Sequence, residues 1–120
     1  MGDYRDLIVY QKAYNLTMDI FEATKKFPPE ERFSLTDQIR KSSRSVCANL
    51  VEAYRRRKYR AHFLSKITDS ETENAETQVW LDFSKDCKYL TLEEYTDFSL
   101  RNDEVGKMIW YMIQNPDKFT

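Results

Sequence analysis

Residues that interrupt helices are scarce in this chain of 120 residues. Glycine occurs twice and proline three times, so few positions force the backbone to turn. Long uninterrupted segments favour helices over a β fold with many turns. Hydrophobic residues make up 41% of the sequence and aromatic residues 14%, which is enough for a core. We therefore expect a single helical domain over residues 1–120.

Cysteine and long apolar runs are also scarce. Cys47 and Cys87 are too few for the disulfide framework of a small secreted domain, so we expect free thiols in a reducing cytoplasm. No apolar run approaches the ~18 residues that a membrane span needs. The amino-terminal stretch MGDYRDLIVYQKAY is charged too early and too often for a signal peptide. These absences predict a soluble, cytoplasmic protein without membrane contact.

Side chains that carry catalysis are few. A nucleophile needs a base within reach, and the usual base is histidine. The only histidine is His62, which lies beside a basic run near a predicted helix start. The two glycines, Gly2 and Gly106, cannot form a phosphate-binding loop. We predict no enzymatic activity, no cofactor and no small-molecule substrate.

Three carboxylates come closest to a metal site. Glu52, Glu73 and Glu76 can face the inside of a bundle, as the glutamates of di-iron bundles do. Those sites also take a Glu-x-x-His pair from each of two helices. Glu73 is followed three residues later by Glu76 and not by histidine, so the motif fails and no metal is predicted.

Apolar residues three or four positions apart predict a first helix over residues 4–26. Its predicted apolar stripe consists of Leu7, Tyr10, Tyr14, Met18 and Phe21. Pro28 and Pro29 follow, and neither can continue a helix interior. A second helix is expected to begin between Glu30 and Leu35 and to end near Arg57.

The remaining helices follow from the same periodicity. The second helix carries a heptad-like seam of Leu35, Ile39, Ser42, Val46, Asn49 and Ala53. A third helix over residues 59–88 has apolar residues at Phe63, Ile67, Val79 and Leu81, with Trp80 beside them. Thr91 and Glu94 have the form of a capping box, so a fourth helix is predicted from there to Gln114. Its apolar positions are Tyr95, Phe98, Val105, Met108, Ile109 and Met112. Short connections between long helices predict an all-α, antiparallel up-down four-helix bundle.

Polar residues occupy positions of the second and third helices where apolar residues are expected. They are Gln38, Ser42, Ser45, Asn49 and Glu52 on the second helix, and Glu73, Asn74 and Glu76 on the third. One interpretation, which we favour, is a hydrogen-bonded network that fixes helix register, with some side chains facing solvent. The other is a subunit interface that tolerates polar contacts.

Charge is segregated along the chain, although the formal net charge is only −1. Residues 40–60 contain eight basic residues and one acidic residue, a local charge of +7, whereas residues 61–82 carry −4. The eight candidate nucleic-acid contacts are Arg40, Lys41, Arg44, Arg55, Arg56, Arg57, Lys58 and Arg60. Arginine pairs with phosphate, and Tyr54 and Tyr59 can stack on unpaired bases. The alternative is that YRRRKYR, residues 54–60, is only a solvated helix junction at one end of the bundle.

The stretch FPPEERFSLTDQIRKSSRSVCANLVEAYRRR, residues 27–57, resembles the signature of the four-helix-bundle proteins encoded in bacterial 23S rRNA intervening sequences. The matching positions are Phe27, Pro28, Glu31, Leu35, Gln38, Ile39, Arg40, Ser45, Asn49 and Glu52. ENAETQVWLDF (residues 73–83) and GKMIWYMIQNPDKF (residues 106–119) also resemble stretches of this family. Ala53 stands where the family usually has glycine, which predicts that the second helix continues into the arginines.

The resemblance implies a bundle with no established enzymatic activity, and an older classification links the family to ribosomal proteins. It implies structural roles for Gln38, Asn49, Glu52, Glu73, Glu76 and Trp80. Related bundles form five-membered rings, and one relative, the accessory protein of diversity-generating retroelements, works with a reverse transcriptase and binds nucleic acid. The implied assembly is thus a homopentamer that binds RNA or DNA through a basic surface. The alternative is a protein–protein scaffold or accessory subunit without nucleic-acid contact.

Overall fold

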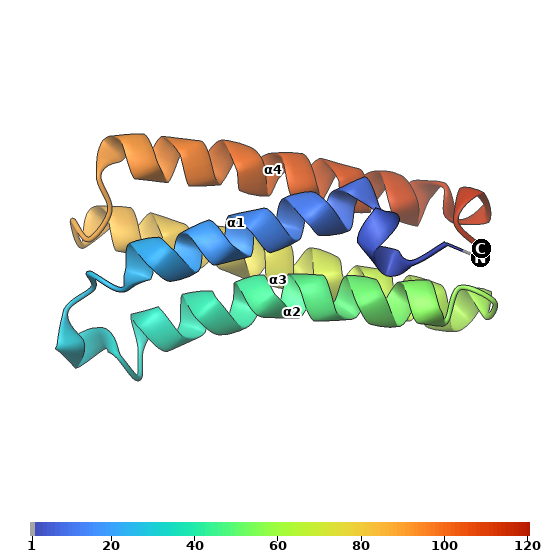
Figure 1. The fold of residues 1–120 in the computed structure, drawn as a ribbon, viewed down its shortest axis with the longest axis horizontal. Helices are drawn as coiled ribbons and strands as arrows, with labels where there is room; N and C mark the ends of the chain where they lie inside the picture. The colour runs from blue at the N-terminus through green and yellow to red at the C-terminus, as the bar shows by residue number, and fades with distance from the viewer. Residues whose placement is uncertain (1) are drawn as a thin grey trace.

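The computed structural model describes residues 2–120 and contains four long helices (Figure 1). They are α1 (Ile8–Thr24), α2 (Leu35–Arg55), α3 (Arg60–Asp86) and α4 (Leu92–Gln114), with 3-10 turns at Tyr4–Asp6, Pro29–Glu31 and Pro116–Lys118. α1 and α3 each pack against both α2 and α4, and the molecule measures 44 × 25 × 20 Å. The prediction of an antiparallel up-down four-helix bundle is confirmed.

The first helix differs from its prediction in length and in the face that it buries. Asp3 caps a separate turn by accepting a hydrogen bond from the Arg5 backbone N–H at 2.9 Å, so the chain bends before α1 begins. The buried apolar side chains of α1 are Val9, Ala13, Leu16 and Ile20. Of the predicted stripe, Tyr14 and Met18 are 48% and 42% exposed. Small and branched side chains pack closely against α2 and α4, whereas a tyrosine at the edge keeps its hydroxyl near water.

The second helix ends at Arg55, and the third begins at Arg60 after a tight turn. Ala53 is fully buried, so its methyl group forms part of the core rather than a turn. The helix therefore continues past the position of the family glycine, as predicted. It includes Arg55 but not Arg56 and Arg57, and this corrects the predicted end near Arg57.

Local hydrogen bonds fix the loops at the opposite end. Thr91 and Glu94 form the predicted capping box: Thr91 Oγ1 accepts from the Glu94 backbone N–H at 3.0 Å, and the Thr91 N–H donates to Glu94 Oε1 at 2.9 Å. The Tyr89 hydroxyl donates to Glu31 Oε2 at 2.9 Å, which ties the α3–α4 loop to the turn before α2. This hydrogen bond raises the pKa of Tyr89 to about 12.

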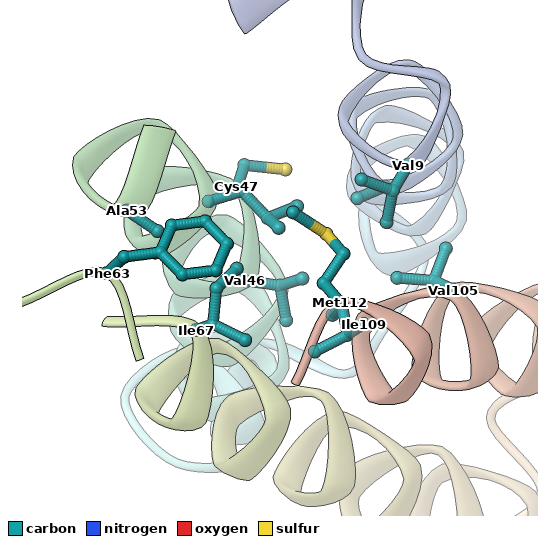
Figure 2. Close-up of a cluster of buried hydrophobic side chains, with 11 residues drawn as sticks. Val9, Val46, Cys47, Ala53, Phe63, Ile67, Val105, Ile109 and Met112 are labelled. Atoms are coloured by element: carbon teal, nitrogen blue, oxygen red, sulfur yellow. The ribbon is translucent and has the colours of Figure 1, made fainter. Parts of the chain in front are cut away.

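The apolar core has two clusters, one toward each end of the bundle. Figure 2 shows the cluster nearer the α2–α3 turn, in which Phe63 and Ile67 of α3 pack with side chains from the other three helices. The second cluster consists of Leu16, Ile20, Phe27, Leu35, Ile39, Leu81, Leu90 and Phe98. Cys47 is buried in the first cluster, and burial raises the pKa of its thiol; both cysteines are free.

A buried polar network joins α3 to its neighbours. Asn74 Nδ2 donates to Asn102 Oδ1 at 2.9 Å, and Asn102 Nδ2 donates to the Asn74 carbonyl at 3.1 Å. The Thr77 hydroxyl donates to Ser42 Oγ at 2.9 Å. An alanine Cβ at Gly106 would lie 2.6 Å from Asn74 Oδ1, so a side chain at this position would force the Asn74 amide to shift. The network interpretation is therefore confirmed for Ser42 and Asn74.

Candidate nucleic-acid interface

The eight basic candidates form two separate groups. Five of them, which we call the junction group, lie at the turn between α2 and α3: Arg55, Arg56, Arg57, Lys58 and Arg60. The described parts of both chain ends lie at this same end of the bundle (Figure 1). The other three, Arg40, Lys41 and Arg44, lie along α2. Arg44 is eleven residues before Arg55, about 16 Å at the rise of a helix, so the basic segment is not one compact patch.

Most side chains of the junction group are exposed. Arg55, Arg56 and Lys58 form no ion pair with any residue between 2 and 120. Arg60 is paired with Asp117. Arg57 stacks over the Tyr54 ring at 3.9 Å and donates to the Tyr54 carbonyl at 2.7 Å, so it is half-buried. The prediction of a largely exposed helix junction at one end of the bundle is confirmed.

The three cations in the first half of α2 are held to different degrees. Arg40 Nε donates to Thr24 Oγ1 at 2.9 Å, and its guanidinium group lies over the Phe21 ring at 4.6 Å. Lys41 forms an ion pair with Asp37 at 3.2 Å. Arg44 is exposed, with its guanidinium group 5.7 Å from the centre of the Phe21 ring. Arg40 therefore links α2 to α1. Arg44 is the member of this group that is most accessible to a ligand.

An open hollow of about 570 Å³ adjoins the junction group. Its lining consists of Gly2, Asp3, Tyr4, Arg5, Tyr54, Arg55 and Arg57. Three arginines and one aspartate make the lining basic. Sequence reasoning missed Tyr4 and Arg5 because they are fifty residues before Tyr54 and Arg55 in the chain. A signal was present, since the dipeptide Tyr-Arg occurs at residues 4–5, 54–55 and 59–60.

Comparison with known proteins identifies relatives of this chain. The family described as 23S rRNA-intervening sequence protein matches residues 5–111. The chain belongs to this family. A crystal structure of a protein of unknown function from the S23 ribosomal protein family of Bacteroides thetaiotaomicron is similar, with 28% sequence identity and a TM-score of 0.81. The similarity covers 89% of this chain and 96% of that chain. No curated protein matches the chain.

Of the residues to which the resemblance assigns structural roles, Trp80 packs against the second apolar cluster, and the polar ones are exposed or half-buried. Gln38, Asn49 and Glu52 share one face of α2, with Gln38 and Glu52 exposed and Asn49 half-buried. Glu52 forms an ion pair of 3.0 Å with Lys66 of α3. On α3, Glu73, Glu76 and Trp80 recur at helical spacing. The structural roles that the resemblance implies for these residues remain predictions.

The Glu73 carboxyl group has an altered pKa in the folded protein. Partial burial, and then the charge of the neighbouring Glu76, raise the pKa of Glu73. An acid whose folded pKa is raised destabilises the folded state when it is ionised, so stability falls as the pH rises from its ordinary pKa of 4.5 through the raised value.

We therefore expect Glu73→Gln to raise the Tm at pH 7.5, by about 2 °C, and to leave it unchanged at pH 3.5. The check is thermal unfolding followed by circular dichroism at both pH values. Glu71→Gln removes one negative charge from the same helix and is the matched control. An equal gain from Glu71→Gln, or a gain at pH 3.5 as large as that at pH 7.5, would contradict the assignment of the effect to the ionised Glu73.

The sequence predicts neither a metal site nor a catalytic role for His62 nor a membrane-spanning helix. Within residues 2–120, no cluster of three or more histidine, cysteine, aspartate or glutamate side chains is suited to a metal ion. His62 is exposed, and its Nδ1 lies 3.3 Å from Arg56 Nη1. None of the described helices combines the length and apolar character required to cross a membrane.

Proposed function

We propose that this family member is a non-enzymatic, oligomeric protein that binds RNA or DNA through the junction group. The observation that carries the proposal is the exposure of Arg55, Arg56 and Lys58 at one bundle end without an ion-pair partner among the described residues. Unpaired surface cations release counterions from a nucleic acid when they neutralise its phosphates. Because these contacts are with the phosphate backbone of the nucleic acid, the affinity should depend little on base sequence and strongly on salt concentration.

Self-association would strengthen the positive electrostatic field that the junction group creates. A ring of five copies, as the resemblance implies, would place five junction groups in one assembly and create a field that a nearly neutral monomer lacks. Support comes from exposed apolar side chains on the outer faces of two helices: Val79 and Phe83 on α3, and Leu100 and Trp110 on α4, each at least 45% exposed. The same side chains also suit the alternative function, a scaffold that binds another protein.

Salt dependence tests the nucleic-acid proposal directly. The triple variant Arg55→Ala, Arg56→Ala, Lys58→Ala retains Arg57, which packs on Tyr54. For a single-stranded RNA of 20 nucleotides, we expect the slope of log K against log salt to fall by about 2, because each lost phosphate contact removes about 0.7. Affinity at 100 mM salt should fall about tenfold or more. Fluorescence anisotropy over a salt series measures both quantities.

The control removes the same number of charges elsewhere. Lys12, Lys85 and Lys107 lie on helices α1, α3 and α4 outside the junction group, and their replacement by alanine leaves the bundle end intact. This variant should keep most of the parental affinity and salt slope. If the junction variant bound as tightly as the parent with the same slope, the junction group would be only a solvated turn.

A further inference from the structure

Aromatic side chains gather on one edge of α1, at the margin of the core. Tyr10 is half-buried and Tyr14 is 48% exposed, and both lie on the α2 side of the helix, outside the buried Val9–Ala13–Leu16 face. Tyr4 meets Tyr10 edge to face, with ring centres 5.0 Å apart. The ring centres of Tyr10 and Tyr14 are 6.0 Å apart, and their ring planes are tilted by 33°. Three rings therefore succeed one another along the surface.

These rings line a second open hollow, of about 530 Å³. It is bounded by Tyr4, Arg5, Tyr10, Gln11, Tyr14 and Asn15. Tyr4 and Arg5 also line the hollow beside the junction group, so the two hollows share a wall. The Arg5 guanidinium group lies 4.6 Å from the centre of the Tyr4 ring. The two hollows are thus adjacent, and we call the succession of rings from Tyr54 past Tyr4 and Tyr10 to Tyr14 the aromatic track.

Cations lie at the junction end of the aromatic track, along it, and beyond Tyr14. Arg55 lines the junction end, and Arg5 lies in the shared wall, where its own ion pair with Asp3 is exposed. Further along the α1–α2 edge, Arg40 and Arg44 stand over Phe21. Tyr10 and Phe21 are eleven residues apart, about 16 Å along α1, which corresponds to about five nucleotides at ~3.4 Å each.

We infer that the aromatic track binds the unpaired bases of a single-stranded nucleic acid, with Arg5, Arg44 and Arg55 holding its phosphates. The inference rests on the proposed function and adds the class of ligand. Partly exposed tyrosine rings interleaved with arginines suit a polyanion that carries its own flat rings. Every base presents a π face, so this stacking tolerates any sequence. A duplex keeps its bases stacked inside and gains only the phosphate contacts.

The test compares two probes of equal length, a 15-nucleotide oligo(U) and a 15-base-pair RNA duplex. We expect the parent protein to bind oligo(U) at least tenfold more tightly than the duplex at the same salt concentration. Tyr10→Leu with Tyr14→Leu removes two rings but keeps apolar, helix-forming side chains. This variant should bind oligo(U) about tenfold more weakly and should bind the duplex as the parent does.

Matched controls separate stacking from folding. Tyr111→Leu removes a tyrosine of similar exposure, 47%, from the outer face of α4, and should change neither affinity. Tyr10→Phe with Tyr14→Phe keeps both rings and should retain the preference for oligo(U). Photocrosslinking of an oligonucleotide that contains 4-thiouridine gives an independent readout, and the crosslinked peptide should contain Tyr10 or Tyr14.

The possible failures are distinguishable. Equal binding of oligo(U) and duplex by the parent would overturn the inference and leave the proposed function standing. Binding of neither probe at low salt would overturn both. If the leucine variant lost oligomeric mass in light scattering and bound both probes equally weakly, the track would be a contact with a second copy of the chain, and the inference would be wrong.

Discussion

Replacing Asn102 by alanine is expected to lower the free energy of unfolding by about 2–3 kcal/mol. Asn102 is only 4% exposed, and its side-chain amide makes contacts with Asn74 and Gln78 of α3. The variant leaves the Asn74 amide with fewer partners and opens space between α3 and α4. Removal of a partner costs more than the bond itself, because the remaining polar group stays buried without its hydrogen bond.

A double-mutant cycle identifies the source of this loss. Asn74→Ala alone should also cost about 2–3 kcal/mol, and the double variant should cost at least 1 kcal/mol less than the two losses combined. Urea unfolding of the four proteins provides the free energies. Asn15→Ala on the exposed side of α1 is the control, with an expected change below about 0.5 kcal/mol. Simple additivity of the two losses would show that the asparagines do not act as a pair.

The second large effect concerns assembly. At micromolar concentration we expect light scattering to return several times the chain mass of 14.4 kDa, with five copies as the value implied by the resemblance. The outer face of α3 offers an apolar group for such a contact: Val79 and Phe83 are 45% and 54% exposed, and the Phe83 ring lies 5.9 Å from that of Trp80. A patch of this kind on a helix surface favours burial against another molecule.

Charge placed in this patch should dissociate the assembly. Val79→Asp with Phe83→Asp puts two carboxylates where an apolar contact would form, and burial of unpaired charge is costly, so the mass should fall to that of the monomer. Ile8→Asp adds a carboxylate to an exposed position of α1 and serves as the control, with no change in mass expected. Circular dichroism should show the same helix content in all variants. A monomeric parent protein would contradict the prediction and weaken the proposed binding.

If the protein assembles and binds nucleic acid as proposed, loss of assembly should weaken binding. If the Val79 and Phe83 variant is monomeric and folded, its affinity for single-stranded RNA should fall, because a multivalent array loses its effective concentration when it dissociates. The junction variant, in contrast, should keep its oligomeric mass. The two variants therefore separate the contribution of the assembly from that of the charges.

The sequence by itself determined the number of helices and where the chain turns. The Pro28–Pro29 pair, the Thr91 capping box and the YRRRKYR junction are local signals, because each acts through the backbone of a few adjacent residues. The buried positions of α2 were also predictable, since Leu35, Ile39 and Val46 repeat on one face with strongly polar residues opposite.

Only the tertiary structure decided which side of α1 faces the core and how the charges are distributed. The predicted Tyr10–Tyr14 stripe and the buried Val9–Ala13 stripe have the same helical spacing, and spacing does not fix how a helix is rotated against its neighbours. The basic residues are spread along α2 and the junction, so Arg44 and Arg55 lie about 16 Å apart, while Arg5 joins Arg55 because the chain ends return to the junction. Packing sets these relations, because a helix buries whichever face fits the adjacent helices most closely.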